Sequence, residues 1–425
     1  MKKIAFHFHN DGVPDIDLSN VTKGNPGVGG TVFLAVLIPT LLANRQKITP
    51  LLLSNKKCII PNQLENVVCN DLYGALDYCR AHKDVDAIVV DSLRIDIGII
   101  KEYEDVNIVL WANNPMKAQY LKNLTYLKNV KRIINVSKEQ CDLARDMLVF
   151  RKCTYIFNAF PMEVVLKYRN LSKPTSQRKH YVVYIASILP PKGFHLLAKV
   201  WPKIIEKVPD AELFVIGSGK LYDKQTKMGK WGISIPEYED YFMRFLSKNG
   251  SILPSVHFLG EMGNEKYEVL SKCKVGVPNP SGITETFGYT AIEMQAMGCL
   301  VTTQKCPGYI DTVFDKSQLY NNPKELCNKI INLLNKTENQ SEKILPWIIE
   351  NFDCETVAQR WEDVLNSDMD LDIIPDEIAK TDLNFHFKRV KEFIRIYIPD
   401  RIKDYLMPLE RIFAFIDGHF VYGKF

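Results

Sequence analysis

Short apolar runs alternate along the chain with stretches whose apolar residues recur at helical spacing. A buried parallel strand is a near-continuous apolar run, whereas an amphipathic helix repeats every three or four residues. In the first half the pattern predicts strands at 4–9, 48–54, 86–92, 106–112, 131–137 and 154–160. It predicts helices at 31–43, 71–81, 115–127 and 138–148. Strand and helix alternating at this spacing indicate a doubly wound parallel sheet.

The same alternation begins again after a polar, turn-prone segment at 172–179, which we interpret as an interdomain linker. Strands are predicted at 181–187, 212–217, 256–260, 275–278 and 300–303, with helices at 194–208 and from 287 to 297. Further helices are predicted between 347 and 365. The predicted fold class is therefore α/β, with one doubly wound domain at 1–172, a second at 180–350, a helical segment at 351–368 and a tail at 373–425.

Composition and charge argue against a nucleic-acid-binding protein, a disulfide-rich secreted protein and a membrane-spanning protein. A chain of 425 residues is long for one core, so two or three domains are expected. A net charge of +4 is too weakly basic to indicate a nucleic-acid partner. Ten scattered cysteines without a Cys-x2-Cys pair indicate reduced thiols in a cytoplasmic protein. No apolar run of 18 residues is present, and no signal peptide is expected, because Met1-Lys2-Lys3 leads straight into a strand.

Two glutamates mark the stretch from 275 to 303. Glu293 lies in a helix that is apolar nearly all round, where a carboxylate costs several kcal/mol unless donors meet it. Glu285 lies in the loop before Phe287-Gly288, where the helix begins with free N–H groups suited to a phosphate. A ribose, a phosphate and a sugar would together fill such a pocket. Alternatively, Glu293 pairs with a buried Lys or Arg, and Glu285 is a solvated loop acid.

Other candidate residues lie at the ends of predicted strands, where ligands of parallel sheets bind. The turn Gly29-Gly30-Thr31 follows the first strand, and its glycines either let a ligand approach the backbone or simply form a loop. Lys192 precedes a glycine after the strand at 181–187, Gly217 closes the next strand, and Asn113 follows the strand at 106–112.

The spacing of Glu285 and Glu293 resembles the Glu-x7-Glu signature of retaining glycosyltransferases of the GT-B fold, family 4 (glycosyl transferases group 1). The flanking pairs Pro280-Ser281, Phe287-Gly288 and Met297-Gly298 resemble it too. The resemblance extends from about residue 4 to about residue 365. It implies two Rossmann-like domains facing across a cleft, with the segment at 351–368 crossing back to the first domain.

The resemblance also implies a role for each matching residue. Glu285 would contact the donor sugar and act in catalysis, Glu293 would bind the ribose, and Lys192 would bind the diphosphate. The donor-binding positions are Lys192, Ser187, Gly217, Glu285, Phe287, Gly288, Tyr289, Thr290 and Glu293. Gly29, Gly30 and Thr31 would face the donor phosphate and the acceptor. Two positions depart from the family: Ser187, where the family has an Arg, and Asn113, the second catalytic position near the reacting carbon, where His is common.

The implied activity is transfer of a sugar, with retention, from a UDP- or GDP-sugar to a glycan or lipid-linked acceptor, as in surface polysaccharide or glycoconjugate synthesis. Neither a metal nor another cofactor is expected. The implied location is the cytoplasm, including the inner face of the membrane. Two alternatives remain open: a non-catalytic nucleotide-sugar-binding regulator, to which Ser187 and Asn113 would be suited, and a sugar-nucleotide epimerase.

The C-terminal tail (residues 373–425) is too rich in aromatic residues to be disordered. Its ten aromatics are Phe385, Phe387, Phe393, Tyr397, Tyr405, Phe413, Phe415, Phe420, Tyr422 and Phe425. At helical spacing one stripe is apolar (Phe387, Val390, Ile394, Tyr397) and the next is basic (Lys388, Lys391, Arg395). The apolar stripe could lie in a membrane interface, pack on the body or meet a second copy. Of these we favour packing on the body.

Overall fold

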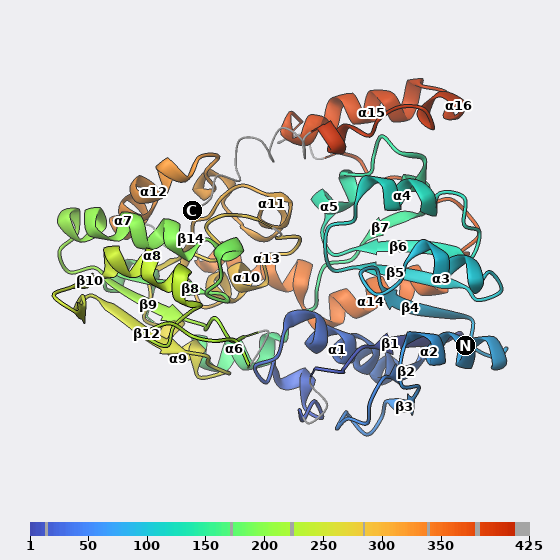
Figure 1. Cartoon of the computed structure of the whole chain (residues 1–425), viewed down its shortest axis with the longest axis horizontal. Coiled ribbons are helices and arrows are strands. Elements are labelled where there is room, and N and C mark those ends of the chain that lie inside the picture. The colour runs from blue at the N-terminus through green and yellow to red at the C-terminus, as the bar shows by residue number, and fades with distance from the viewer. Residues whose placement is uncertain are drawn as a thin grey trace. The chain divides into compact units, whose positions relative to one another are not determined.

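The computed structural model describes residues 1–12, 16–170, 173–221, 225–283, 285–337, 341–378 and 383–412. The chain divides into two units, shown in Figure 1. The first unit comprises Met1–Thr22, Thr31–Ala159 and Val357–Phe425, and the second comprises Lys23–Gly30 and Phe160–Thr356. Each unit has its own hydrophobic core around a parallel sheet.

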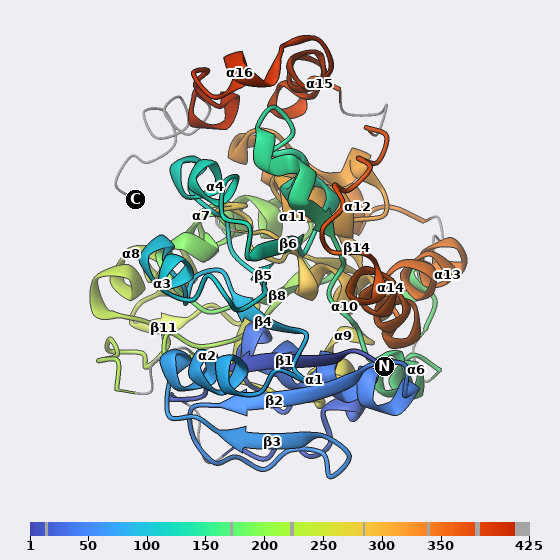
Figure 2. The same ribbon diagram turned by 90° about the vertical axis from the view of Figure 1, so that its right-hand side faces the viewer.

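The sheet of the first unit has seven strands in the order β3-β2-β1-β4-β5-β6-β7, all parallel. Figure 2 shows β3, β2, β1 and β4 stacked in this order. The strands are β1 (Lys3–Phe8), β2 (Thr49–Ser54), β3 (Glu65–Val68), β4 (Ala87–Asp91), β5 (Ile108–Ala112), β6 (Val130–Asn135) and β7 (Cys153–Tyr155). The predicted doubly wound arrangement is confirmed, and β3 is an additional edge strand.

Helices connect these strands. They are α1 (Gly30–Arg45), α2 (Leu72–Ala81), α3 (Ile97–Glu102), α4 (Ala118–Leu124) and α5 (Lys138–Asp142). The apolar periodicity predicts all of them except α3. A later helix, α14 (Cys354–Asn366), runs from the second unit into the first. Its buried Trp361 has its ring centroid 5.0 Å from that of Trp111 and 6.0 Å from that of Phe6. The core of the first unit is therefore completed by a segment from late in the chain.

The sheet of the second unit has five parallel strands in the order β12-β9-β8-β13-β14. They are β8 (Tyr181–Ile185), β9 (Glu212–Ile216), β12 (Val256–Gly260), β13 (Val275–Gly276) and β14 (Leu300–Val301), and a separate hairpin joins β10 (Ser247–Lys248) to β11 (Ser251–Ile252). The helices are α6 (Met162–Arg169), α7 (Phe194–Lys207), α8 (Pro236–Leu246), α9 (Lys266–Leu270), α10 (Tyr289–Ala296), α11 (Pro307–Thr312), α12 (Leu326–Leu334) and α13 (Ser341–Phe352).

Residues 173–179 are not an open linker. Arg178 is buried and donates hydrogen bonds to the carbonyl oxygens of Cys273 (2.8 Å) and Met297 (2.6 Å). The hydroxyl of Thr175 donates to the carbonyl of Gly298 at 2.6 Å. This polar stretch therefore belongs to the second unit, where its side chains satisfy loop carbonyls that would otherwise be buried without donors.

The tail forms α15 (Lys388–Tyr397) and α16 (Asp400–Lys403), which pack on the first unit (Figure 1). Packing on the body was predicted, but the predicted contact face is wrong. Two residues of the basic stripe are buried, with Lys388 2% and Lys391 0% exposed, and Arg395 is half-buried, while the apolar stripe includes Tyr397 at 68%. The predicted aromatics Phe413, Phe415, Phe420, Tyr422 and Phe425 lie outside the described residues. Across the described part of the chain, no helix is long and apolar enough to cross a membrane.

Candidate functional site

Two loops meet at the carboxyl ends of β8 and β13 in the second unit. After β8, a short 3₁₀ turn (Pro190–Lys192) leads to Gly193, which has a φ of +65° and precedes α7. A Cβ atom on Gly193 would lie 2.7 Å from the backbone nitrogen of Ser281, so only glycine permits this approach. The Ser281 hydroxyl donates to the carbonyl oxygen of Pro191 at 2.6 Å. These contacts fix Lys192 beside the loop that carries Glu285.

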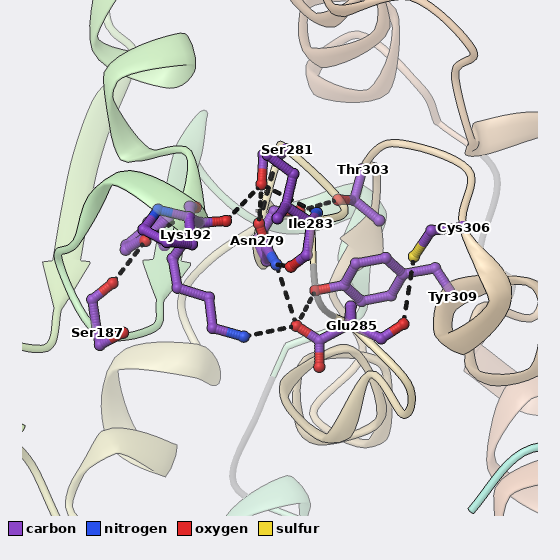
Figure 3. Close-up of polar contacts among 11 residues, drawn as sticks. Ser187, Lys192, Asn279, Ser281, Ile283, Glu285, Thr303, Cys306 and Tyr309 are labelled. Atoms are coloured by element: carbon purple, nitrogen blue, oxygen red, sulfur yellow. Dashed lines mark hydrogen bonds and ion pairs between the residues drawn. The ribbon is translucent and has the colours of Figure 1, made fainter. Parts of the chain in front are cut away.

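Lys192 and Glu285 form an ion pair, shown in Figure 3, with Nζ and Oε2 3.0 Å apart. Oε2 also accepts hydrogen bonds from Asn279 Nδ2 at 3.2 Å and from the Tyr309 hydroxyl at 3.5 Å. No described residue donates a hydrogen bond to Oε1 of Glu285. Glu285 is therefore not a solvated loop acid, because one of its oxygens is held by three donors.

The loop around Glu285 is fixed by its own polar contacts. Asn279 Nδ2 donates to the carbonyl of Ile283 at 3.0 Å, and the Thr303 hydroxyl donates to the carbonyl of Asn279 at 2.7 Å. Burial, with the Glu285 carboxylate nearby, raises the pKa of Tyr309 well above its usual range. The Tyr309 hydroxyl therefore stays protonated at neutral pH and remains a donor to Glu285.

Glu293 lies on α10, buried in the second unit, and already has partners. Its Oε1 lies 2.7 Å from Lys266 Nζ and accepts a hydrogen bond from the Tyr267 hydroxyl at 3.1 Å. Pairing with a largely buried lysine, the alternative left open by the sequence, therefore describes its contacts. Both contacts reach Oε1, and no described residue donates to Oε2. Lys266 and Tyr267 open α9, between Glu265 and Glu268, and the local sequence gave no signal of this role.

The other predicted donor-binding residues lie at the strand ends and at the start of α10. Ser187 is 2% exposed, and its hydroxyl has no hydrogen-bond partner among the described residues. Phe287 is buried with its ring centroid 5.7 Å from that of Phe352, and α10 begins at Tyr289 with Gly288 as its N-cap and Thr290 in its first turn. Gly217 has a φ of +136°, and a Cβ there would lie 1.9 Å from the Ala186 carbonyl oxygen.

The glycine turn falls where the chain passes between the units. Gly30 begins α1. Gly29 and Gly30 group with the second unit and Thr31 with the first. The turn therefore lies after β1 and at the start of a helix, as the sequence predicts.

In the first unit, Asn113 lies just beyond β5 and borders a small cavity of about 20 Å³, enough for one water molecule. Asp91, the last residue of β4, lines the same cavity. Burial raises the pKa of Asp91, and a hydrogen bond with Asn113 acts in the opposite direction. Sequence reasoning missed Asp91, although an acid at the end of the apolar run at 87–91 was a usable signal.

Comparison with known proteins finds similarity to sugar-transferring enzymes, centred on the second unit. The family model described as glycosyl transferases group 1 matches residues 179–336. The GPI3 subunit of phosphatidylinositol N-acetylglucosaminyltransferase from Saccharomyces cerevisiae is 24% identical over 264 residues, covering 58% of this chain. The match covers 53% of that protein, so the chain spans about half the length of the curated relatives it matches.

Solved structures show the same fold over most of the chain. Anabaena Alr3699/HepE in complex with UDP and glucose aligns with a TM-score of 0.56 at 16% identity, covering 86% of this chain and 99% of that one. Sucrose-phosphate synthase from Thermosynechococcus elongatus aligns with a TM-score of 0.61 at 14% identity, covering 86% and 98%. The chain therefore has the predicted GT-B fold of two Rossmann-like units, with additional C-terminal helices.

Proposed function

We propose that the protein is a retaining glycosyltransferase of the family 4 type that takes its sugar from a nucleotide-diphosphate donor. The observation that carries the proposal is the Lys192–Glu285 pair, held at the strand ends of the unit that the family model matches. A cation beside a carboxylate with one open oxygen suits a ligand that is anionic at one end and rich in hydroxyls at the other. The UDP and glucose bound by HepE support a UDP-sugar as donor, with a GDP-sugar as the alternative.

The proposed reaction breaks the bond between the anomeric carbon and the diphosphate oxygen, whose electron pair leaves with the nucleoside diphosphate. Lys192 stabilises the negative charge that develops there, together with the N–H groups at the start of α10. The acceptor hydroxyl oxygen bonds to the anomeric carbon on the same face, and its proton passes to the departing diphosphate. Glu285 Oε1 accepts a hydrogen bond from the sugar, and Glu293 Oε2 accepts one from the ribose. This scheme requires no metal or other cofactor.

The proposed acceptor is a glycan or a lipid-linked molecule, and the reaction takes place in the cytoplasm at the membrane face. The GPI3 relative, named for transfer to phosphatidylinositol, supports a lipid-linked acceptor. In the first unit, Asp91 and Asn113 are the polar groups that we propose for binding the acceptor hydroxyl, because they share a cavity at the strand ends. Surface polysaccharide or glycoconjugate synthesis is the proposed setting.

A second candidate function is nucleotide-sugar binding without transfer. It is favoured by Ser187, whose buried hydroxyl stands where the family has a second cation for the diphosphate. With a single lysine on the diphosphate, stabilisation of the leaving group would be weaker than with two cations.

The two candidates are separated by incubating the protein with a panel of nucleotide sugars and measuring free nucleoside diphosphate. We expect release from one donor, and Glu285→Gln should lower its rate about a hundredfold while nucleoside diphosphate affinity stays unchanged, because the lost contact is to the sugar. The control is Glu268→Gln, which changes an exposed glutamate on α9 of the same unit. Binding without release would support the non-catalytic candidate, and equal losses of affinity and rate would contradict a sugar-facing Glu285.

A further inference from the structure

The helix α15 is docked with its charged side toward the protein. Lys388 pairs with Glu139 of α5, and Lys391 Nζ donates to the carbonyl of Leu143 at 2.9 Å and lies 3.2 Å from Glu410 Oε2. Arg145, which is itself buried, lies 3.3 Å from Glu392. A surface helix normally buries its apolar side. Here the buried charges of the body determine which side faces inward, because each would be costly without its partner.

The apolar side of α15 therefore faces outward. We call this exposed surface the tail face and define it by Phe387, Val390, Phe393, Ile396, Tyr397 and Tyr405. Each of these side chains is at least 42% exposed, with Phe393 at 56% and Tyr405 at 90%. Contiguous exposed apolar side chains of this kind mark a contact surface, since soluble proteins rarely leave them uncovered.

The exposed charges beside the tail face are mainly positive. Arg389, Arg401 and Arg411 are exposed, and the exposed acid in the described part of 387–412 is Asp400. Asp400 Oδ2 lies 2.6 Å from Arg151, so its charge is neutralised by the body. In a symmetric dimer through this face the same patch would meet itself, bringing arginine toward arginine. An anionic partner avoids that repulsion.

We propose that the tail face docks on an anionic lipid bilayer, with Phe393 and Tyr397 inserted at the level of the headgroups and the three arginines on the lipid phosphates. Aromatic side chains favour this interfacial depth, and each arginine near an anionic surface adds attraction that salt weakens. The geometry is that of a helix lying on a membrane, whose basic residues beside an apolar face are typical of interfacial binding. The inference is independent of the proposed transferase activity.

The test is flotation of the full chain with vesicles made of equal parts phosphatidylcholine and phosphatidylserine, with pure phosphatidylcholine vesicles in parallel. We expect binding to the mixed vesicles at low salt, weaker binding at high salt and little binding to phosphatidylcholine. Phe393→Ser/Tyr397→Ser should lower the partition coefficient by at least about tenfold, because two large apolar side chains no longer leave water.

The matched control is Ile59→Ser/Tyr73→Ser, which removes two comparably exposed apolar side chains (57% and 45%) elsewhere on the first unit and should bind as the unchanged protein does. Arg389→Glu/Arg401→Glu should also lower the partition coefficient by about tenfold or more at low salt. The difference from the unchanged protein should shrink at high salt. Thermal unfolding of each variant verifies that it folds.

Three results would overturn the proposal. One is a full chain that does not float with anionic vesicles at any salt concentration. Another is Phe393→Ser/Tyr397→Ser floating as well as the unchanged protein. The third is a dimer in sedimentation that this variant abolishes while vesicle binding is absent throughout, which would assign the tail face to a second copy.

Discussion

At the scale of single residues, Glu293 combines two roles that substitution can separate. It is buried beside Lys266, and its Oε2 is the oxygen we assign to the ribose. Glu293→Ala should remove nucleotide affinity and also lower the free energy of unfolding by about 3 kcal/mol, because it leaves a largely buried ammonium without its carboxylate. Chemical denaturation and calorimetric titration measure the two effects.

The double variant Glu293→Ala/Lys266→Met is the control for the ion pair. It should recover most of the lost stability, because neither charge then remains buried, but it should not recover nucleotide affinity. If the double variant binds the nucleotide normally, Glu293 serves only as a partner for Lys266.

At the scale of elements, the orientation of α15 depends on the Lys388–Glu139 pair. Lys388→Met leaves the buried Glu139 carboxylate without this cation, so docking of the helix should weaken by about 3 kcal/mol. Hydrogen exchange of the α15 amides should then speed up, while exchange in the β5 amides stays unchanged. Arg389→Met, one residue away and exposed, is the control and should leave exchange unaltered.

Adding Glu139→Leu to Lys388→Met removes the stranded charge and should slow the exchange of α15 again. Unchanged exchange in Lys388→Met alone would mean that the other contacts of α15, such as Lys391 with the Leu143 carbonyl, suffice to hold the helix.

At the scale of the whole molecule, the two units have separate cores, so a ligand of one need not stabilise the other. UDP at about a hundredfold its dissociation constant should stabilise the second unit by about 2.7 kcal/mol. Calorimetry should therefore show two unfolding transitions, and UDP should raise the midpoint temperature of one and leave that of the other unchanged. Leu213 in β9 and Leu110 in β5 are both fully buried. Leu213→Ala and Leu110→Ala assign the transitions, since each should lower only the midpoint temperature of its own unit. A single transition displaced equally by both variants would contradict separate unfolding.

Local pattern predicted most of both sheets because parallel strands are buried on both faces and stand out as apolar runs, as β4 does at Ala87–Asp91. It missed β3 because Glu65–Val68 is an edge strand without buried residues, and α3 because Ile97–Glu102 is too short to show a helical period.

The candidate site was predictable only residue by residue. Lys192 and Glu285 were each predicted, but 93 positions separate them, and their 3.0 Å contact depends on the fold. The pairing of Glu293 with Lys266 could not be predicted from the sequence for the same reason. The two stripes of α15 were visible, yet the periodicity cannot tell which stripe meets the body, because Glu139 lies 249 positions earlier.

The late contribution of α14 to the first unit has a consequence for biosynthesis. Phe6 and Trp111 leave the ribosome long before Trp361, whose ring packs against both. At 5–20 residues per second, the roughly 250 residues between Trp111 and Trp361 take about 10–50 seconds to translate. During that time the continuous stretch Phe160–Thr356 emerges, while the earlier segments still expose the apolar surface that Trp361 will cover. The nascent chain therefore completes its second unit before its first, and the first is the one that needs protection from aggregation during translation.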